Sequence, residues 1–90
     1  MTVTVPDDLT VVEGIGPKMN DALHRAGILT FAQLAASSND ALQAAVSAAG
    51  LAFAPSIPTW ANQAGFLARG DRIGFEAYAH RLVAGRDPNA

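Results

Sequence analysis

The segment Gly14-Ile15-Gly16-Pro17 constrains the fold of this chain more than any other part of the sequence. Two glycines separated by one aliphatic residue let the backbone reverse within a short distance, and a proline presets the φ angle of a first helical turn. Free N–H groups at a helix N-terminus, together with the positive end of the helix dipole, favour an anion such as a phosphate. The segment therefore predicts a tight turn that leads into a helix and offers backbone amides to an anionic ligand.

Capping residues, apolar spacing and terminating glycines predict six short helices. The second helix starts directly at Pro17, whereas the others follow a predicted N-cap: Asp7 or Asp8, Thr30, Ser38, Thr59 and Asp71. The residues predicted to end the six helices are, in order, Glu13, Gly27, Ser37, Gly50, Gly70 and Gly85. Residues 51–58, which contain two prolines and several apolar side chains, are expected to form an ordered connector pressed onto the core.

A chain of 90 residues is long enough for one small domain and its core. We expect a short N-terminal segment over residues 1–6, a single domain over 7–85 and a frayed tail over 86–90. The chain has no cysteine, so packing must stabilise it without disulfides or thiolate-bound metal. No apolar run approaches the ~20 residues needed to span a bilayer, and no secretory signal is apparent, so we expect a soluble, cytoplasmic protein without a membrane partner.

The motifs of this chain resemble those of a known family. In the first half they are Asp7-Asp8-Leu9, Gly14-Ile15-Gly16-Pro17, Leu23, Ala26-Gly27-Ile28, Thr30-Phe31 and Gln33-Leu34-Ala35. In the second half they are Pro58-Thr59-Trp60, Gln63-Ala64, Gly70-Asp71 and residues 82–86. Together they are similar to a bacterial branch of the helix-hairpin-helix superfamily, whose small domains occur alone or fused to other proteins, including ribosomal ones.

The resemblance implies an all-α, compact bundle of about five or six short helices, with one well-formed helix-hairpin-helix unit and a degenerate second unit. It also implies nucleic-acid binding through backbone amides. The positions that match the phosphate-contacting part of the motif are Gly14, Ile15, Gly16, Lys18 and Met19. Two features weaken this expectation: Glu13 places a negative charge beside the hairpin, and the second unit has no glycine turn.

The candidate binding residues also have plainer interpretations. The glycines of the hairpin can simply permit a tight turn. Lys18 and Arg25 lie seven positions apart on one helix face and can contact successive phosphates, but Asp21 lies between them and can pair with either. A mixed-charge, solvated helix face is the favoured interpretation of these three residues.

No catalytic residue, metal site or cofactor is predicted. His24 and His80 lack partners at metal-ligand spacing, and His80 stands four positions after Glu76, which predicts a surface pair. The serines have no neighbouring base, and the adjacent carboxylates of Asp7 and Asp8 are explained by helix capping. Some related domains are named after flap-endonuclease segments, which leaves a small nuclease as a third hypothesis without assigned residues.

The aromatic residues are predicted to belong to the core. Trp60, Phe75 and Tyr78 fall on apolar stripes of helical spacing. A base-stacking surface would alternate aromatic with basic residues, and we do not interpret the aromatic residues of this chain in that way. Phe66 is off the Trp60 stripe, so it either faces a partner or closes the seam with the last helix.

The sequence thus predicts a non-enzymatic binding module. The leading hypothesis is weak, sequence-independent contact with a DNA or RNA backbone through the amides of residues 14–19, assisted by Lys18 and Arg25. The alternative is a domain for interaction or scaffolding with another protein or with itself, favoured by the net charge of −2 and by the apolar connector over residues 51–58. Oligomeric state and the identity of the partner are not predicted.

Overall fold

The computed structural model describes residues 5–51, 55–83 and 85–88. These residues form one 3₁₀ helix and five α-helices. In chain order they are η1 (Leu9–Val11), α1 (Pro17–Arg25), α2 (Phe31–Ala35), α3 (Asn39–Ala48), α4 (Ile57–Ala68) and α5 (Arg72–His80). The prediction of an all-α bundle is confirmed, and the one β-type pairing in the described ranges is an isolated bridge between Val83 and Arg86.

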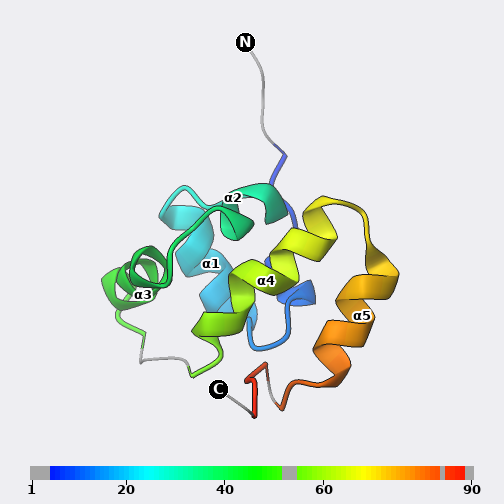
Figure 1. The fold of residues 1–90 in the computed structure, drawn as a ribbon. Helices are drawn as coiled ribbons and strands as arrows, with labels where there is room; N and C mark the ends of the chain where they lie inside the picture. The colour runs from blue at the N-terminus through cyan, green and yellow to red at the C-terminus, as the bar shows by residue number, and fades with distance from the viewer. Residues whose placement is uncertain (1–4, 52–54, 84, 89–90) are drawn as a thin grey trace.

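Helix α4 runs through the middle of the molecule (Figure 1). Helix α3 lies on one side of α4 and α5 on the other, and α2 packs across α4. The hairpin that connects η1 to α1 lies beside α4, so the central helix contacts most of the other elements. In the part of the chain that the structure describes, no helix has the length and apolar character required to cross a bilayer.

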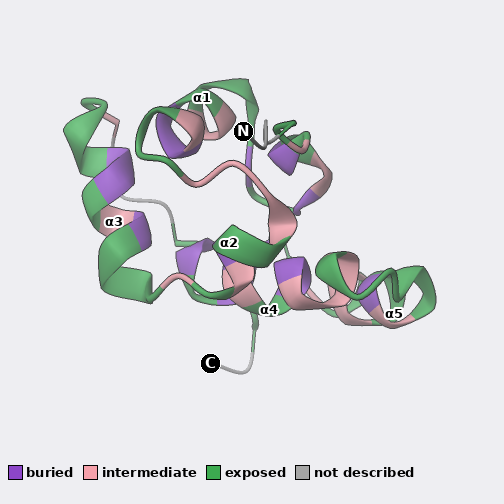
Figure 2. Ribbon diagram, turned by 90° about the horizontal axis from the view of Figure 1, so that it is seen from above, coloured by how far each residue is buried: buried purple, intermediate pink, exposed green. Residues whose placement is uncertain are grey.

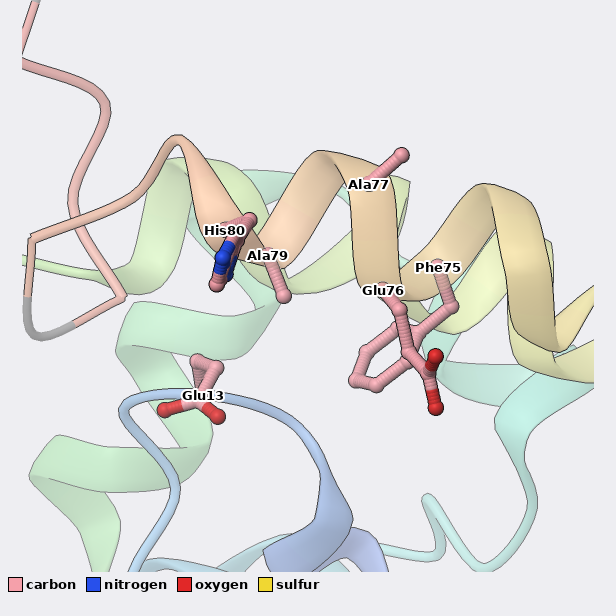
Figure 3. A pocket seen from close by; sticks show the side chains of 6 residues that line it. All are labelled: Glu13, Phe75, Glu76, Ala77, Ala79 and His80. Carbon is pink, nitrogen blue, oxygen red and sulfur yellow. The ribbon is translucent and has the colours of Figure 1, made fainter.

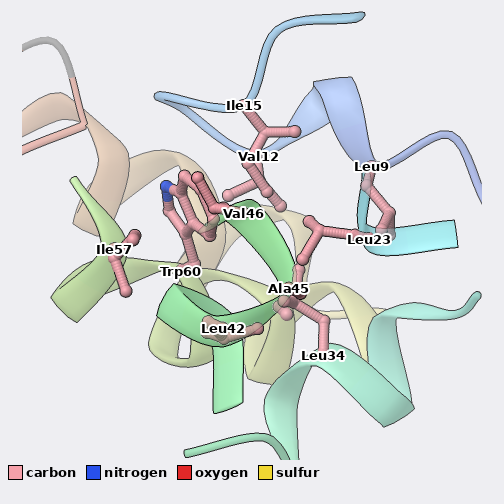
Figure 4. Close-up of a cluster of buried hydrophobic side chains, with 11 residues drawn as sticks. Leu9, Val12, Ile15, Leu23, Leu34, Leu42, Ala45, Val46, Ile57 and Trp60 are labelled. Atoms are coloured by element: carbon pink, nitrogen blue, oxygen red, sulfur yellow. The ribbon is translucent and has the colours of Figure 1, made fainter. Parts of the chain in front are cut away.

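The core is formed by apolar side chains from η1, the hairpin and the first four α-helices. Figure 4 shows Val12 and Ile15 of the hairpin in one cluster with the indole of Trp60, which is 0% exposed. Leu23, Leu34, Leu42 and Val46 are also fully buried in this cluster. Burial of about eight such side chains, each contributing roughly 1.5 to 3 kcal/mol, is the main stabilising term for a domain without disulfides.

The helices are amphipathic, as their spacing predicts. In Figure 2 the buried residues of α3 face the centre of the molecule and its outer side is exposed. Four of the five predicted N-caps are confirmed: Asp8, Thr30, Ser38 and Asp71 each accept a hydrogen bond from a backbone N–H of the following turn. Thr30 and Gln33 form a complete capping box.

The predicted start of α4 at Thr59 is wrong. The helix begins at Ile57 after Ser56, with Pro58 inside its first turn. Proline is tolerated there because its missing N–H would have no helical acceptor. The prolines therefore do not exclude residues 57 and 58 from the helix, and Leu51 and Ile57 pack on the core. Residues 52–54 of the predicted connector lie outside the described residues.

The predicted end of the last helix at Gly85 is also wrong. Helix α5 stops at His80, and the chain then forms a tight turn in which Val83 and Arg86 exchange two backbone hydrogen bonds of 2.8 and 2.9 Å. Gly85 has φ +80°, a conformation that favours glycine. Arg86, expected at the start of a frayed tail, is thus paired with Val83, and residues 89 and 90 lie outside the described part of the chain.

Candidate nucleic-acid interface

The backbone reverses in a four-residue turn over residues 12–15. The Ile15 N–H donates to the Val12 carbonyl oxygen at 3.1 Å, and Gly14, the third residue of the turn, has φ +97°. A positive φ at this position favours glycine because a Cβ is strained there. A Cβ on Gly14 would also overlap the buried Ser56 side chain, whose hydroxyl oxygen accepts from Trp60 Nε1 at 3.0 Å. Gly14 is therefore required by the fold.

Gln63 of α4 holds the hairpin in place. Its side chain is 0% exposed, and its amide oxygen accepts from the Glu13 N–H at 2.7 Å while its amide nitrogen donates to the Glu13 carbonyl oxygen at 3.0 Å. The same nitrogen donates to Thr59 Oγ1 at 3.1 Å. Sequence reasoning missed this role, although a glutamine three positions after Trp60 on a buried helix stripe is a signal for a buried polar contact.

The C-terminal turn closes the other side of the hairpin. A Cβ on Gly85 would overlap the Glu13 carbonyl group and crowd the Gly14 Cα. The Thr59 hydroxyl contacts the Gly85 carbonyl oxygen, which ties this turn to α4. The hairpin is therefore held between α4 and the last described turn, a tertiary contact that no local pattern indicates.

Gly16 differs from Gly14. It has φ −91° and ψ −179°, and a Cβ at this position would meet nothing within 4 Å. Gly16 is the N-cap of α1 and provides no side chain to cap the helix, and Pro17 has no N–H to cap. No described residue accepts a hydrogen bond from the N–H groups of Gly16, Lys18 or Met19. These amides remain accessible to a group from outside the chain.

The other predicted site residues lie around this N-terminus in different ways. The Ile15 side chain is buried and its amide is used by the turn, while Met19 is half-buried against the core and offers only its amide. Lys18 and Arg25 are exposed and line one shallow cavity of about 200 Å³ between α1 and the end of α3. The structure thus brings both cations to one groove along α1, and Lys18 lies in the first turn of that helix.

Asp21 lines the same groove between the two cations. In the described structure it forms no ion pair with Lys18 or Arg25, so the pairing that the spacing allows is not made. An unpaired carboxylate in the groove lowers the local positive potential, and this limits the affinity for any polyanion.

A larger cavity of about 510 Å³ separates the hairpin from α5 (Figure 3). Glu13 reaches toward it from the hairpin, and His80, Glu76 and Phe75 reach toward it from α5. The predicted hydrogen bond between Glu76 and His80 is not formed. Within the described residues, no group of three histidine or carboxylate side chains is placed to hold a metal ion.

Asp7 and Asp8 both have structural roles. The Asp7 carboxylate accepts from the Phe31 N–H at 2.8 Å and so joins the N-terminal segment to α2. Hydrogen bonds from the Thr10 hydroxyl and backbone N–H hold the pKa of the Asp8 carboxyl below its usual range. His24 Nε2 lies 3.1 Å from the Asp7 carbonyl oxygen. This pair of acids is thus accounted for by capping.

The aromatic prediction is confirmed in part. Trp60 and Phe75 are buried, whereas Phe66 and Tyr78 are half-buried and meet edge to face at 5.7 Å between α4 and α5. Phe66 therefore closes the seam with the last helix. The interpretation that aromatic and basic residues do not alternate is wrong, because an arginine three positions away lies over each of Phe66, Phe75 and Tyr78.

Comparison with known proteins gives the family. Residues 9–68 match the model of the RS2/RL21/YNQ2 HHH domain, a stretch that starts at η1 and ends with α4. The chain belongs to this helix-hairpin-helix family. The match includes the hairpin, Gly16 and Gln63, and it stops before α5 and the turn that carries Gly85.

The relatives include three bacterial proteins named large ribosomal subunit protein bL21. The protein of Ruegeria sp. (strain TM1040) is 42% identical over 64 residues, which are 71% of this chain and 29% of the relative. That of Mesorhizobium japonicum is 63% identical over 30 residues, 33% of this chain and 14% of the relative. The chain thus spans less than a third of the length of these relatives. No solved structure matches it.

Proposed function

We propose that this domain is a non-enzymatic module that binds the sugar-phosphate backbone of nucleic acid at the N-terminus of α1. The observation that carries the proposal is the contrast between the two glycines of the hairpin. The fold requires Gly14, whereas a Cβ at Gly16 would meet nothing within 4 Å. A residue without a side chain at Gly16 instead allows an external phosphate to approach the amides of Gly16, Lys18 and Met19.

Lys18 and Arg25 supply the charge for this contact. They share a groove along α1, so they can reach phosphates beyond the one bound by the amides. Two cations correspond to a salt slope near −2 and a loss of roughly tenfold in affinity between about 50 and 200 mM salt. With a net charge of −2, one copy of the domain is expected to bind weakly, with a dissociation constant of about 10⁻⁴ M or above at physiological salt.

RNA is the nucleic acid that the comparisons favour. The relatives are named as proteins of the large ribosomal subunit, a particle that contains RNA. Backbone amides contact phosphates without reading bases, so the hairpin alone does not distinguish RNA from DNA. We therefore expect binding to duplex RNA and, through the same amides, to duplex DNA.

Fluorescence anisotropy with labelled duplex RNA and duplex DNA at the two salt concentrations tests the proposal. The Gly16→Val variant should lose binding, because its side chain keeps the phosphate away, and should keep the helical circular dichroism of the parent. Ala44→Val, on the exposed side of α3, is the matched control and should bind as the parent does. A folded Gly16→Val variant with parental affinity would contradict the proposal.

A second candidate function is protein interaction. It is favoured by Ile73 and Val83, which are 84% and 62% exposed although both are large and apolar. Exposed apolar residues of this kind are found at protein interfaces, and a net negative charge does not oppose a protein partner. Absence of any salt-dependent nucleic-acid binding by the parent would favour this function.

A further inference from the structure

A groove on a different side of the molecule from the hairpin combines arginine and aromatic side chains. Its volume is about 590 Å³, and it lies where α2, α4 and α5 meet, lined by Asn62, Phe66, Arg69, Tyr78 and Arg81 among others. Figure 2 shows α1 on one side of the molecule and α4 with α5 on the other. The groove therefore lies away from the amides at the start of α1. Its volume is in the range of pockets that bind small organic ligands.

The two arginines that line the groove are stacked on its aromatic rings. The Arg69 guanidinium carbon lies 5.0 Å from the centroid of Phe66, and that of Arg81 lies 5.5 Å from the centroid of Tyr78. Such a contact orients the planar guanidinium with one face against the ring. Because Phe66 and Tyr78 themselves meet edge to face, the two stacked pairs are held beside each other.

Four of the six basic residues of the chain lie in its second half. Residues 55–88 contain four arginines and three carboxylates, a net charge of +1, whereas residues 5–51 contain two basic and five acidic residues, a net charge of −3. The Asp87 side chain also lines the groove, so its charge is two arginines against one carboxylate. The groove lining therefore has a net charge of +1, which favours an anion.

We propose that this groove binds an unpaired nucleotide of single-stranded RNA. Unstacked bases stack on guanidinium planes and aromatic rings, and arginine N–H groups donate to phosphate oxygens. Arg69 and Arg81 offer both kinds of contact within one cavity, and the exposed Asn62 side chain offers polar groups to a base edge. An acidic peptide has charge for the arginines but no flat ring to cover the guanidinium faces, so the nucleotide matches the groove more fully.

Titration of the full chain with a labelled short oligouridylate tests this site. Arg69→Gln and Arg81→Gln should each weaken binding by roughly five- to hundredfold, the range measured when one stacking contact is removed. The matched control is Arg72→Gln. Arg72 also lies over an aromatic ring, Phe75 at 5.8 Å, but it does not line the groove, so this variant should bind as the parent does. All three arginines are exposed, and circular dichroism should show unchanged folding.

Competition separates a nucleotide site from a simple anion site. Uridine monophosphate should displace the oligouridylate at concentrations where inorganic phosphate or an oligoglutamate peptide does not. Equal losses in all three variants, or equal displacement by inorganic phosphate or the peptide, would overturn the proposal.

The proposed hairpin site and the proposed groove site can be tested independently of each other. Gly16→Val should lose duplex binding and retain oligouridylate binding. Arg81→Gln should lose oligouridylate binding and retain duplex binding, except for the small loss of affinity that the removal of one positive charge causes. Loss of both activities in Gly16→Val would mean that one surface binds both ligands, and the separate groove site would be rejected.

Discussion

Two glycines of one hairpin, separated by a single residue, are present for different reasons. At Gly14 the positive φ and the adjacent Ser56 side chain mean that any other residue type would strain the backbone or overlap Ser56. At Gly16 the backbone is extended and the space around it is open, so the fold accepts any small residue. A motif with two glycines thus contains one structural position and one position left free for a ligand.

Substitution by alanine should separate the two positions. Gly14→Ala should lower the free energy of unfolding by at least about 1 to 3 kcal/mol, because it adds a Cβ at a positive φ and against a buried side chain. Gly16→Ala should change it by less than about 0.5 kcal/mol. Urea unfolding followed by circular dichroism measures both values. Equal losses in the two variants would contradict the distinction.

The Asp8 carboxylate makes a pH-dependent contribution to stability. Its pKa is lowered in the folded protein by the hydrogen bonds from Thr10, so its stabilising effect is present above the pKa of the unfolded chain, about 3.9. The effect should disappear as the pH falls through the lower folded pKa. In Asp8→Asn the side chain can still cap the helix, but it has no carboxyl group to titrate. The stability difference between parent and variant should therefore change below about pH 4 and stay constant above pH 5. A difference that is the same at all pH values would refute this assignment.

At the scale of elements, the hairpin is positioned by α4. Gln63 satisfies both backbone groups of Glu13, Ser56 fills the space beside Gly14, and Thr59 ties in the C-terminal turn at Gly85. These three side chains lie on one face of the helix and its N-cap. The contacts from α4 therefore fix the position of the hairpin that leads into α1, and with it the direction of the free amides at the start of α1.

Removal of the Gln63 contacts should loosen the hairpin. Gln63→Met keeps the length of the side chain but leaves two backbone groups of Glu13 without their partner, at a cost of about 1 to 3 kcal/mol. Hydrogen exchange of the Glu13 amide should become faster. Gln43→Met is the matched control, since the Gln43 amide oxygen is buried without a partner and its amide nitrogen bonds only Ser47. A larger loss in the control would contradict the role of Gln63.

Contacts between residues close in the sequence could be predicted from it, whereas contacts between different helices could not. The N-caps Asp8, Thr30, Ser38 and Asp71 were predictable because each bonds an amide within three residues. The start of α4 and the end of α5 were not, because Pro58 fits either side of a helix start and Gly85 is required by a contact with the hairpin. Within the candidate site, the amides of Gly16 to Met19 follow from the motif, whereas the stacked arginines depend on how α4 and α5 pack.

The whole molecule is organised around one central helix. Trp60 of α4 is 0% exposed and meets the hairpin and the other helices in a single core. Phe75 of α5 is also buried but lies outside this cluster, on the side where α5 packs on α4. One contiguous core favours cooperative unfolding of the domain.

Trp60 should report the unfolding of the entire domain. Its emission should be blue-shifted in the native protein, because the indole is excluded from water, and should move to longer wavelength on unfolding. The urea midpoint from fluorescence should equal that from circular dichroism. A later or earlier midpoint by circular dichroism would mean that a helix, such as α5, unfolds independently of the core.

The open space at Gly16 has a practical consequence for chemical labelling. Since the chain contains no cysteine, a Gly16→Cys substitution introduces a single thiol, at the N-cap of α1 and with nothing within 4 Å of its Cβ. A thiolate at a helix N-terminus is stabilised by the same dipole and free amides that would attract a phosphate. The pH dependence of its alkylation, compared with that of Ala44→Cys on the exposed side of α3, therefore measures the attraction of this site for a negative charge without any nucleic acid present.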